Sequence, residues 1–279
     1  MRHFCFSVVF LLVASFQTSA QNTSNSAALR IVALSPHTTE MVYELGLGGS
    51  LIATVDFADF PEEAQQVPRV GGSYGLSIEK IVSLKPDVVL AWRGGNKAGD
   101  IEKLESLGLN IVDSSPTSID QVASEYRRIG KLLGVTAQAN EIANKFEHKL
   151  SLIKQQYIGK AQIASFYQMW PDPLMTINNT TWTHRVLALC GAQNVFAEQT
   201  ASYPQISVEN VIVKQPDIII VPMERDQSVS PANHWLKWQQ IPAVKEKKFV
   251  MADADLLHRF TSRALIGAER LCADIDKYR

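Results

Sequence analysis

The sequence predicts an α/β protein with two similar α/β lobes, each with a central, mostly parallel sheet, joined by a single long α-helix, with a ligand cleft between the lobes. Three observations support this prediction. Short apolar runs alternate with helical stretches through most of the chain. A motif of helix, turn and strand occurs twice. A long helical stretch at residues 137–157 lies between the two copies.

The alternation begins with an apolar run at residues 30–34, which indicates a buried strand. The next stretch has helical spacing and ends at Gly46, a residue that easily adopts the left-handed cap conformation. Strands that alternate with helices favour a parallel sheet. The expected strands are residues 30–34, 51–55, 88–92, 110–112, 163–167, 218–221 and 248–251, and the expected helices are 38–45, 78–84, 100–107 and a closing helix that ends at 278.

The alternation stops between residues 118 and 157, where two helical stretches follow each other. In the second stretch, apolar residues such as Ala139, Ala143 and Phe146 recur at helical spacing. About 20 residues at 1.5 Å each form a rod of roughly 30 Å, long enough to cross a domain. We therefore expect a first lobe at residues 21–135, a linking helix at 136–157 and a second lobe at 158–279.

The internal repeat consists of residues 77–90 and 207–220, which align without a gap. Serine, glutamate, proline and aspartate are identical at matching positions, and the apolar positions are conservatively exchanged. Each copy predicts a capped short helix, a turn at proline and aspartate, and a buried strand. The repeat therefore predicts that the two lobes have similar folds.

The composition is that of a packed protein. The chain has 279 residues, of which 46% are hydrophobic, and a formal net charge of −1. A disordered chain would have fewer apolar residues and a larger charge imbalance. The balanced charge gives no basic surface for nucleic acid, so we expect no nucleic-acid partner.

The first residues are typical of a cleaved signal peptide. A short basic start precedes an apolar run at residues 4–16, and small residues follow up to Ala20. The apolar run is too short to span a membrane, which takes about 20 apolar residues. Cleavage after residue 20 would remove Cys5 and leave Cys190 and Cys272. Two cysteines in an exported protein suggest a disulfide, and two buried free thiols are the alternative.

One motif offers a catalytic alternative. Residues 71–75 match the nucleophile-elbow pattern around Ser73, which would make the protein a secreted serine hydrolase. That serine requires a strand directly before it and a helix directly after it. Pro68 interrupts the preceding run, and the next helix does not begin before Ser77, so the context disfavours this alternative.

The histidines of the mature chain are scattered, with no pair at metal-ligand spacing. His37 and His258 are expected in loops that face a cleft, where one of them could contact a ligand or its metal. Aromatic residues also fall in expected loops and at strand ends on both sides of the helical connection, and together they could line a cleft between lobes. These aromatic residues are Phe57, Phe60, Tyr74, Trp92, Trp170 and Tyr203.

Glu79 and Glu209 occupy the same position in the two copies of the repeat. Acidic residues are common in the first turn of a helix, where they offset its dipole, and this explains either residue alone. The helix dipole does not explain why both lobes carry a glutamate at the same position of the repeat. Two acidic side chains on a pseudo-symmetric body suit a two-fold partner with basic pockets, so we favour docking over capping.

Several of these motifs resemble a known family. Residues 30–36 with Thr39 and Glu40, followed by residues 77–79 and 85–87, resemble the helix-linked substrate-binding proteins of ABC importers. That family binds metal chelates, including ferric siderophores, haem and cobalamin. Further segments are similar to its cobalamin-binding members, and the similarity covers essentially the whole mature chain. These segments are residues 91–96, 190–191, 203–205 and 271–272.

The resemblance implies a periplasmic protein that captures cobalamin and delivers it to the permease dimer of an ABC importer, with its ATPase subunits, in the inner membrane. A haem or ferric-siderophore binder of the same fold is the alternative. We expect no catalysis, no resident cofactor and no metal site of the protein's own. The free protein should be a monomer that reaches the membrane only through the permease.

The resemblance also implies roles for particular residues. Glu79 and Glu209 match the glutamates that contact arginines of the permease, and Cys190 and Cys272 match a disulfide within the second lobe. Residues 255–259 depart from the family pattern, because leucines stand where relatives have aromatics. The expected ligand-binding residues are Phe57, Tyr74, Trp92, Trp170, Tyr203, His258 and Arg259.

Overall fold

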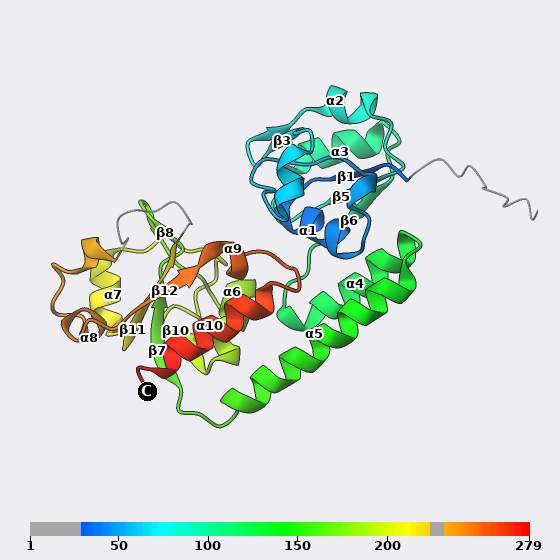
Figure 1. Cartoon of the computed structure of the whole chain (residues 1–279). Helices are drawn as coiled ribbons and strands as arrows, with labels where there is room; N and C mark the ends of the chain where they lie inside the picture. Colours follow the sequence, from blue (N-terminus) through cyan, green and yellow to red (C-terminus); the bar gives the residue numbers. More distant parts are fainter. Residues whose placement is uncertain (1–28, 224–231) are drawn as a thin grey trace, which may run out of the picture.

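The computed structural model of the chain describes residues 29–223 and 232–279. The expected signal peptide, residues 1–20, and the first residues of the expected first lobe, 21–28, lie outside the described residues. Two lobes, each with a four-stranded sheet, are joined by a pair of long helices (Figure 1). This architecture confirms the predicted fold class. Within the described ranges, no helix is long and apolar enough to cross a membrane.

The first lobe has a sheet of order β2-β1-β5-β6 in which all pairs are parallel. A small antiparallel hairpin, β3 with β4, stands beside this sheet. The strands are β1 (Ile31–Ala33), β2 (Leu51–Ala53), β3 (Gly71–Gly72), β4 (Gly75–Leu76), β5 (Val88–Ala91) and β6 (Ile111–Asp113). The helices are α1 (Pro36–Glu44), α2 (Ile78–Ser83) and α3 (Ala98–Ser106), with short 3₁₀ turns η1 (Gly48–Ser50) and η2 (Glu62–Gln66).

The second lobe has a sheet of order β10-β7-β11-β12, again parallel throughout, and a second hairpin, β8 with β9. Its strands are β7 (Ile163–Tyr167), β8 (Trp170–Pro171), β9 (Leu174–Met175), β10 (Ala192–Asn194), β11 (Ile218–Met223) and β12 (Phe249–Asp253). Its helices are α6 (Trp182–Leu189), α7 (Val208–Lys214), α8 (Pro242–Lys245), α9 (Ala254–Leu257) and α10 (Ala264–Asp276), with a 3₁₀ turn η4 (Asn233–Trp235).

The connection between the lobes is an antiparallel helix pair. The 3₁₀ turn η3 (Ile119–Gln121) leads into α4 (Val122–Leu132), and α5 (Thr136–Tyr157) returns toward the second lobe (Figure 1). The two helices approach closely because Gly130 lies against Ala139, where a Cβ on the glycine would come within 2.1 Å of the alanine Cβ. The 22 residues of α5 make a rod of about 33 Å.

The two copies of the sequence repeat form the same unit, α2–β5 in one lobe and α7–β11 in the other. Lys85 and Gln215, just before the repeated proline, both adopt a left-handed conformation, with φ of 45° and 47°. Asp87 and Asp217, just after it, each accept a hydrogen bond from a backbone N–H at the start of the neighbouring strand, at 2.8 and 3.1 Å. The repeated aspartates therefore fix β5 and β11 beside β1 and β7.

The largest buried core runs through both lobes. It includes Met41 and Leu90 of the first lobe, Phe146 and Leu150 of α5, and Leu271 of α10. Two further clusters fill the outer faces of the two sheets. In Figure 1, α10 lies along α5. The connecting helices α4 and α5 thus share one buried core with both lobes.

The second lobe contains a disulfide and a loop that reaches the first lobe. Cys190, at the end of α6, and Cys272, in α10, form a disulfide, which confirms the predicted pairing. The predicted closing helix is α10, which begins at Ala264; the short helix α9 before it ends at Leu257, and the residues that connect the two helices contact the first lobe. We call these connecting residues, 258–263, the junction loop.

Candidate functional site

The carboxyl ends of the two sheets meet at the junction between the lobes. His37 follows β1, Trp92 follows β5, and Phe260 of the junction loop follows β12 and α9. The rings of His37 and Phe260 lie 4.9 Å apart, and those of Trp92 and Phe260 lie 5.6 Å apart. The ring of Trp182 of α6 also lies 4.6 Å from that of Phe260. Ligands of open α/β sheets bind beyond the carboxyl ends of the strands, so this is where the site is expected.

The segment after β5 is shaped around its tryptophan. A Cβ on Gly95 would lie 2.1 Å from the Trp92 ring, so only glycine allows the indole to lie against this backbone. Asn96 fixes the turn, because its side-chain oxygen accepts from the Trp92 N–H at 2.7 Å and its amide donates to the Leu34 carbonyl at 2.7 Å. The half-buried Trp92 is therefore held in one position at the edge of the junction.

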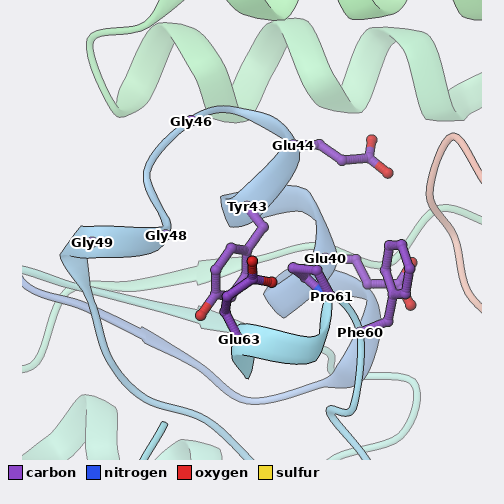
Figure 2. Close-up of a pocket in the computed structure, with 9 residues that line it drawn as sticks. All are labelled: Glu40, Tyr43, Glu44, Gly46, Gly48, Gly49, Phe60, Pro61 and Glu63. Carbon is purple, nitrogen blue, oxygen red and sulfur yellow. The ribbon is translucent and has the colours of Figure 1, made fainter. Parts of the chain in front are cut away.

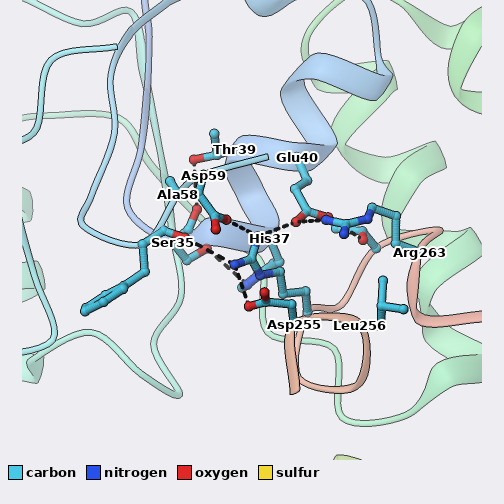
Figure 3. Close-up of polar contacts among 12 residues, drawn as sticks. Ser35, His37, Thr39, Glu40, Ala58, Asp59, Asp255, Leu256 and Arg263 are labelled. Atoms are coloured by element: carbon cyan, nitrogen blue, oxygen red, sulfur yellow. Dashed lines mark hydrogen bonds and ion pairs between the residues drawn. The ribbon is translucent and has the colours of Figure 1, made fainter. Parts of the chain in front are cut away.

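A buried ion network joins the lobes beside the aromatic cluster. Glu40 of α1 is fully buried, and one of its oxygens accepts from both Arg259 and Arg263 at 2.8 Å. The other oxygen accepts from the Thr261 hydroxyl at 2.9 Å. Figure 3 shows Glu40 and Arg263 pointing toward each other from the two lobes. Because a buried carboxylate without partners is costly, these contacts fix the first lobe against the junction loop.

A second buried carboxylate extends this network. Glu44, one turn further along α1, accepts from the hydroxyls of Tyr126 and Ser262, the latter at 2.9 Å. Burial raises the pKa of Glu44, and these two hydrogen bonds oppose that rise. Burial together with the nearby Glu44 carboxylate raises the pKa of Tyr126 well above its usual value. The junction loop is thus bound to α1 and α4 as well as to its own lobe.

His37 does not lie in a loop, so that prediction was wrong. Ser35 caps α1 and Pro36 begins it, which places His37 in the first helical turn, buried. Its Nε2 donates to the Ser114 carbonyl at 3.0 Å, so its Nδ1 accepts from the Ser35 hydroxyl at 3.1 Å. Burial lowers the pKa of His37 to about 4. The histidine is a neutral part of the core between the lobes.

His258 begins the junction loop, and its Nε2 lies 2.8 Å from the Tyr167 hydroxyl at the end of β7. Burial lowers the pKa of His258 to about 4 and raises the pKa of Tyr167 far above its usual value. Both side chains are therefore uncharged at neutral pH. In the described ranges, no group of three or more His, Cys, Asp or Glu side chains could hold a metal ion.

Four expected ligand residues expose their rings at loops and hairpins. Phe57 is 79% exposed in the segment after β2, and Tyr74 is 98% exposed between β3 and β4. Trp170 of β8 is 55% exposed and Tyr203 is 49% exposed.

Arg259 is in a different situation from these rings. It is buried and bound to carboxylates from both lobes, Asp255 beside it and Asp59 of the first lobe. Figure 3 shows Asp59 and Asp255, two carboxylates that pair with the Arg259 guanidinium. Burial lowers the pKa of Arg259, but hydrogen bonds to Glu40 and Asp59 more than offset this, and the net effect is a rise.

Ser73 lies in the turn between β3 and β4. A strand follows it, whereas a nucleophile elbow places a helix there. The elbow that the hydrolase alternative requires is therefore not formed.

The permease-docking candidates are exposed at equivalent places. Glu79 is in the first turn of α2 and Glu209 in the first turn of α7. The pKa of Glu209 is lowered by its own backbone N–H and by the Ser207 hydroxyl. Figure 1 places α2 and α7 at the outer ends of the two lobes, away from α5.

A cavity of about 700 Å³ opens on the first lobe, beside the ion network (Figure 2). It is formed by the end of α1, the η1 turn and the start of η2, and Glu40 and Glu44 lie at its edge. None of the expected ligand residues lines it. Its lining residues are Glu40, Tyr43, Glu44, Gly46, Gly48, Gly49, Phe60, Pro61 and Glu63.

Sequence reasoning missed most of the junction. Glu40 was named only as part of a family motif, and no role at the site was predicted for Arg263, Phe260 or Trp182. One local signal was available, because a serine followed by proline is a typical helix start and would have placed His37 and Glu40 on one helix. The pairing of Glu40 with residues of the junction loop spans 219 positions, and no local pattern reports it.

Comparison with known proteins agrees with this architecture. Residues 31–256 match the sequence profile of the periplasmic binding protein family. The chain belongs to this family. It is 34% identical over 246 residues to the vitamin B12-binding protein of Vibrio cholerae serotype O1, with 88% of each chain covered.

Two solved structures have a fold similar to that of this chain. The periplasmic vitamin B12 binding protein BtuF of Vibrio cholerae superposes with a TM-score of 0.82 at 33% identity, covering 89% of this chain and 97% of BtuF. The periplasmic heme-binding protein RhuT from Roseiflexus sp. RS-1, in its apo form, superposes with a TM-score of 0.79 at 21% identity, covering 90% and 99%. The second likeness concerns the fold alone.

Proposed function

We propose that this protein captures cobalamin between its two lobes and delivers it to the permease of an ABC importer. The observation that supports this most is the 34% identity to the vitamin B12-binding protein of Vibrio cholerae over 88% of both chains. The protein acts in the periplasm after cleavage of residues 1–20, as a free monomer, by binding and without catalysis.

The exposed rings suit this ligand. A corrin has broad apolar faces and a polar edge of amides, so aromatic side chains can cover the faces while polar groups meet the edge. Phe57 and Tyr74 of the first lobe and Trp170 and Tyr203 of the second offer such rings, and Trp92 stands beside the junction. We assign all five to the ligand site, together with His258 at the start of the junction loop.

Titration with cyanocobalamin tests the proposal. Tryptophan fluorescence of the purified protein should be quenched in a saturable way at one ligand per protein, because Trp92 and Trp170 are in the proposed site. Phe57→Ala should weaken binding about tenfold, since it removes an aromatic ring from the ligand contact. Val213→Ala, at a valine that is also 79% exposed but lies on α7, is the matched control and should bind normally.

Haemin and a ferric siderophore are titrated in parallel, because haem and siderophore binders share this fold. Saturable binding of one of them with no binding of cyanocobalamin would overturn the proposal. The neutral His258 imidazole is a type of group that can bind haem iron, so a haemin spectrum that depends on His258 would identify that alternative.

We further propose that Glu79 and Glu209 dock the protein on basic residues of the permease. The Glu79→Lys, Glu209→Lys double variant should lose cobalamin uptake in cells while its cyanocobalamin affinity stays within about twofold of wild type, because both residues lie away from the junction. Glu102→Lys, at another exposed glutamate of the first lobe, is the control and should transport normally. Normal uptake by the double variant would contradict the docking proposal and would mean that both glutamates only stabilise the first turn of their helices.

A further inference from the structure

Phe57 has an uncommon backbone conformation for its residue type. Its φ is +62°, in the left-handed region that favours glycine, and its ring is 79% exposed. A bulky residue keeps such a conformation only where surrounding contacts hold it. We call residues 55–59 the Phe57 loop and ask which contacts hold it.

Two arginines bind the Phe57 loop, one from each lobe. Arg69, of the same lobe, donates to the carbonyls of Val55 at 3.1 Å and Ala58 at 3.0 Å. Arg259, of the opposite lobe, donates to the carbonyl of Phe57 itself at 3.3 Å and pairs with Asp59 at 2.7 Å. Phe57 is therefore held in its strained conformation by Arg259, which lies in the opposite lobe.

Both terminal nitrogens of Arg259 contact protein groups. One terminal nitrogen contacts Glu40 at 2.8 Å and Asp59 at 2.7 Å, and the other contacts Asp255 at 2.9 Å and the Phe57 carbonyl. Three of these contacts are hydrogen bonds, to Glu40, Asp255 and Phe57, and the contact with Asp59 is an ion pair. The side chain is also buried. Both terminal nitrogens of Arg259 thus face protein groups while these contacts persist.

Glu40 sets the direction of Arg259. Its carboxylate is fully buried on α1, and its other oxygen accepts from the Thr261 hydroxyl at 2.9 Å, so it provides a fixed anchor. Asp255, four residues before Arg259, anchors the other terminal nitrogen. With both terminal nitrogens bound in this way, the guanidinium stays within hydrogen-bond distance of the Phe57 carbonyl.

We propose that Arg259 is a positioning residue, oriented by Glu40, which acts on the ligand through the Phe57 loop instead of contacting it. The second lobe thereby holds a ring of the first lobe in its binding position. This assignment rests on the proposed function, and it replaces the expectation that Arg259 binds the ligand directly.

A double-mutant cycle on cyanocobalamin affinity tests the proposal. Arg259→Met should weaken binding about tenfold in the wild-type background, because the Phe57 ring loses its fixed position. In the Phe57→Ala background the same change should cost less than about twofold, because the group it positions is gone. An equal loss in both backgrounds would mean direct contact or a general structural effect, and would overturn the proposal.

Arg263→Met is the matched control. Arg263 pairs with the same Glu40 oxygen and stacks on the Phe60 ring at 3.6 Å, whereas the donor to the Phe57 carbonyl is Arg259. Methionine can keep that ring contact. This variant should retain cyanocobalamin affinity within about twofold, although it removes an equal charge from the network. A tenfold loss here would contradict a role specific to Arg259.

Hydrogen exchange of the ligand-free protein gives a second readout. The amides of residues 55–59 should exchange at least about fivefold faster in Arg259→Met than in wild type, and at the wild-type rate in Arg263→Met. Unchanged exchange in both variants would overturn the positioning role. If wild type binds no cyanocobalamin, the proposed function fails, while this exchange experiment still decides the role of Arg259. Should Arg259→Met not fold, Arg259→Lys enters the same experiments, since lysine keeps the charge but cannot reach four acceptors.

Discussion

Helices α2 and α7 occupy equivalent places in the two lobes but begin in different ways. In α7, Ser207 and Asn210 form a reciprocal capping box, in which the Ser207 hydroxyl accepts from the Asn210 N–H and the Asn210 side chain accepts from the Ser207 N–H. In α2, Ser77 makes no such bond, and Lys80 at the matching position donates to the Arg69 carbonyl at 2.7 Å.

The glutamate is the same in both helices although the cap is not. If Glu79 and Glu209 served only to stabilise the helix start, the two lobes could differ at this position as freely as they differ at the cap. Their identity therefore favours a role outside the helix, which supports the docking proposal. The lobes share their sheet order and their exposed acid, and they differ in the contacts that stabilise each one locally.

The largest local difference is the disulfide between Cys190 and Cys272, which has no counterpart in the first lobe. Replacing both cysteines with alanine should lower the free energy of unfolding by about 4 kcal/mol, because the bridge closes a long loop. Urea unfolding of the wild-type and double-alanine proteins measures this.

Hydrogen exchange of the same pair of proteins resolves the effect by lobe. Amides of α6 and α10 should lose more protection than those of β1 and β5. A uniform loss across both sheets would show that the bridge stabilises the whole chain and would remove this difference between the lobes.

Each lobe contributes one histidine with a strongly lowered pKa to the junction, His37 from the first and His258 from the second. Both have a pKa of about 4 in the folded protein, against 6.5 for an ordinary histidine. The unfolded chain therefore binds more protons between pH 6.5 and pH 4, so stability is fully present above about pH 6.5 and falls as the pH falls toward 4. For the fully buried His37 the loss by pH 4 is about 3 kcal/mol.

Urea unfolding between pH 4.5 and 7.5 measures this dependence in wild type and in three variants. His37→Gln should have a flatter profile than wild type over the acidic range, and His258→Gln should differ in the same direction. His148→Gln, at an exposed histidine of α5, is the control and should follow wild type. A His37→Gln profile as steep as that of wild type would assign the acid sensitivity to other groups.

The smallest expected difference concerns the helix caps. Ser207→Ala should destabilise the protein by about 1 kcal/mol, because it removes the acceptor for the Asn210 N–H. Ser77→Ala should cost clearly less, at most about 0.5 kcal/mol, because that serine makes no cap bond. Thermal unfolding of the two variants side by side measures this, and equal losses would mean that both serines cap their helices in solution.

The sequence predicted the fold well because the signals were local and came twice. Glycines and prolines bounded the strands and helices, and the gap-free repeat indicated the two equivalent lobes. The pairing of Cys190 with Cys272 was also within reach, since only two cysteines remain after cleavage at the expected site.

The site was harder to predict because its contacts cross the chain. Residues 258–263 leave α9 and meet Glu40 and Glu44 of the other lobe. The partners in these contacts lie more than 200 positions apart in the chain, so no local sequence pattern reports them. Arg259 was assigned to the ligand from family resemblance, and only the positions of its four partners suggest that it acts through Phe57.

The core that runs from Met41 through Phe146 to Leu271 has a thermodynamic consequence. Both lobes and the connecting helices share this core, so the loss of one lobe would expose apolar area of the rest. The unfolding of one lobe should therefore lower the stability of the other, although each lobe can open locally on its own. Two sheets that are separate in topology thus depend on one shared core.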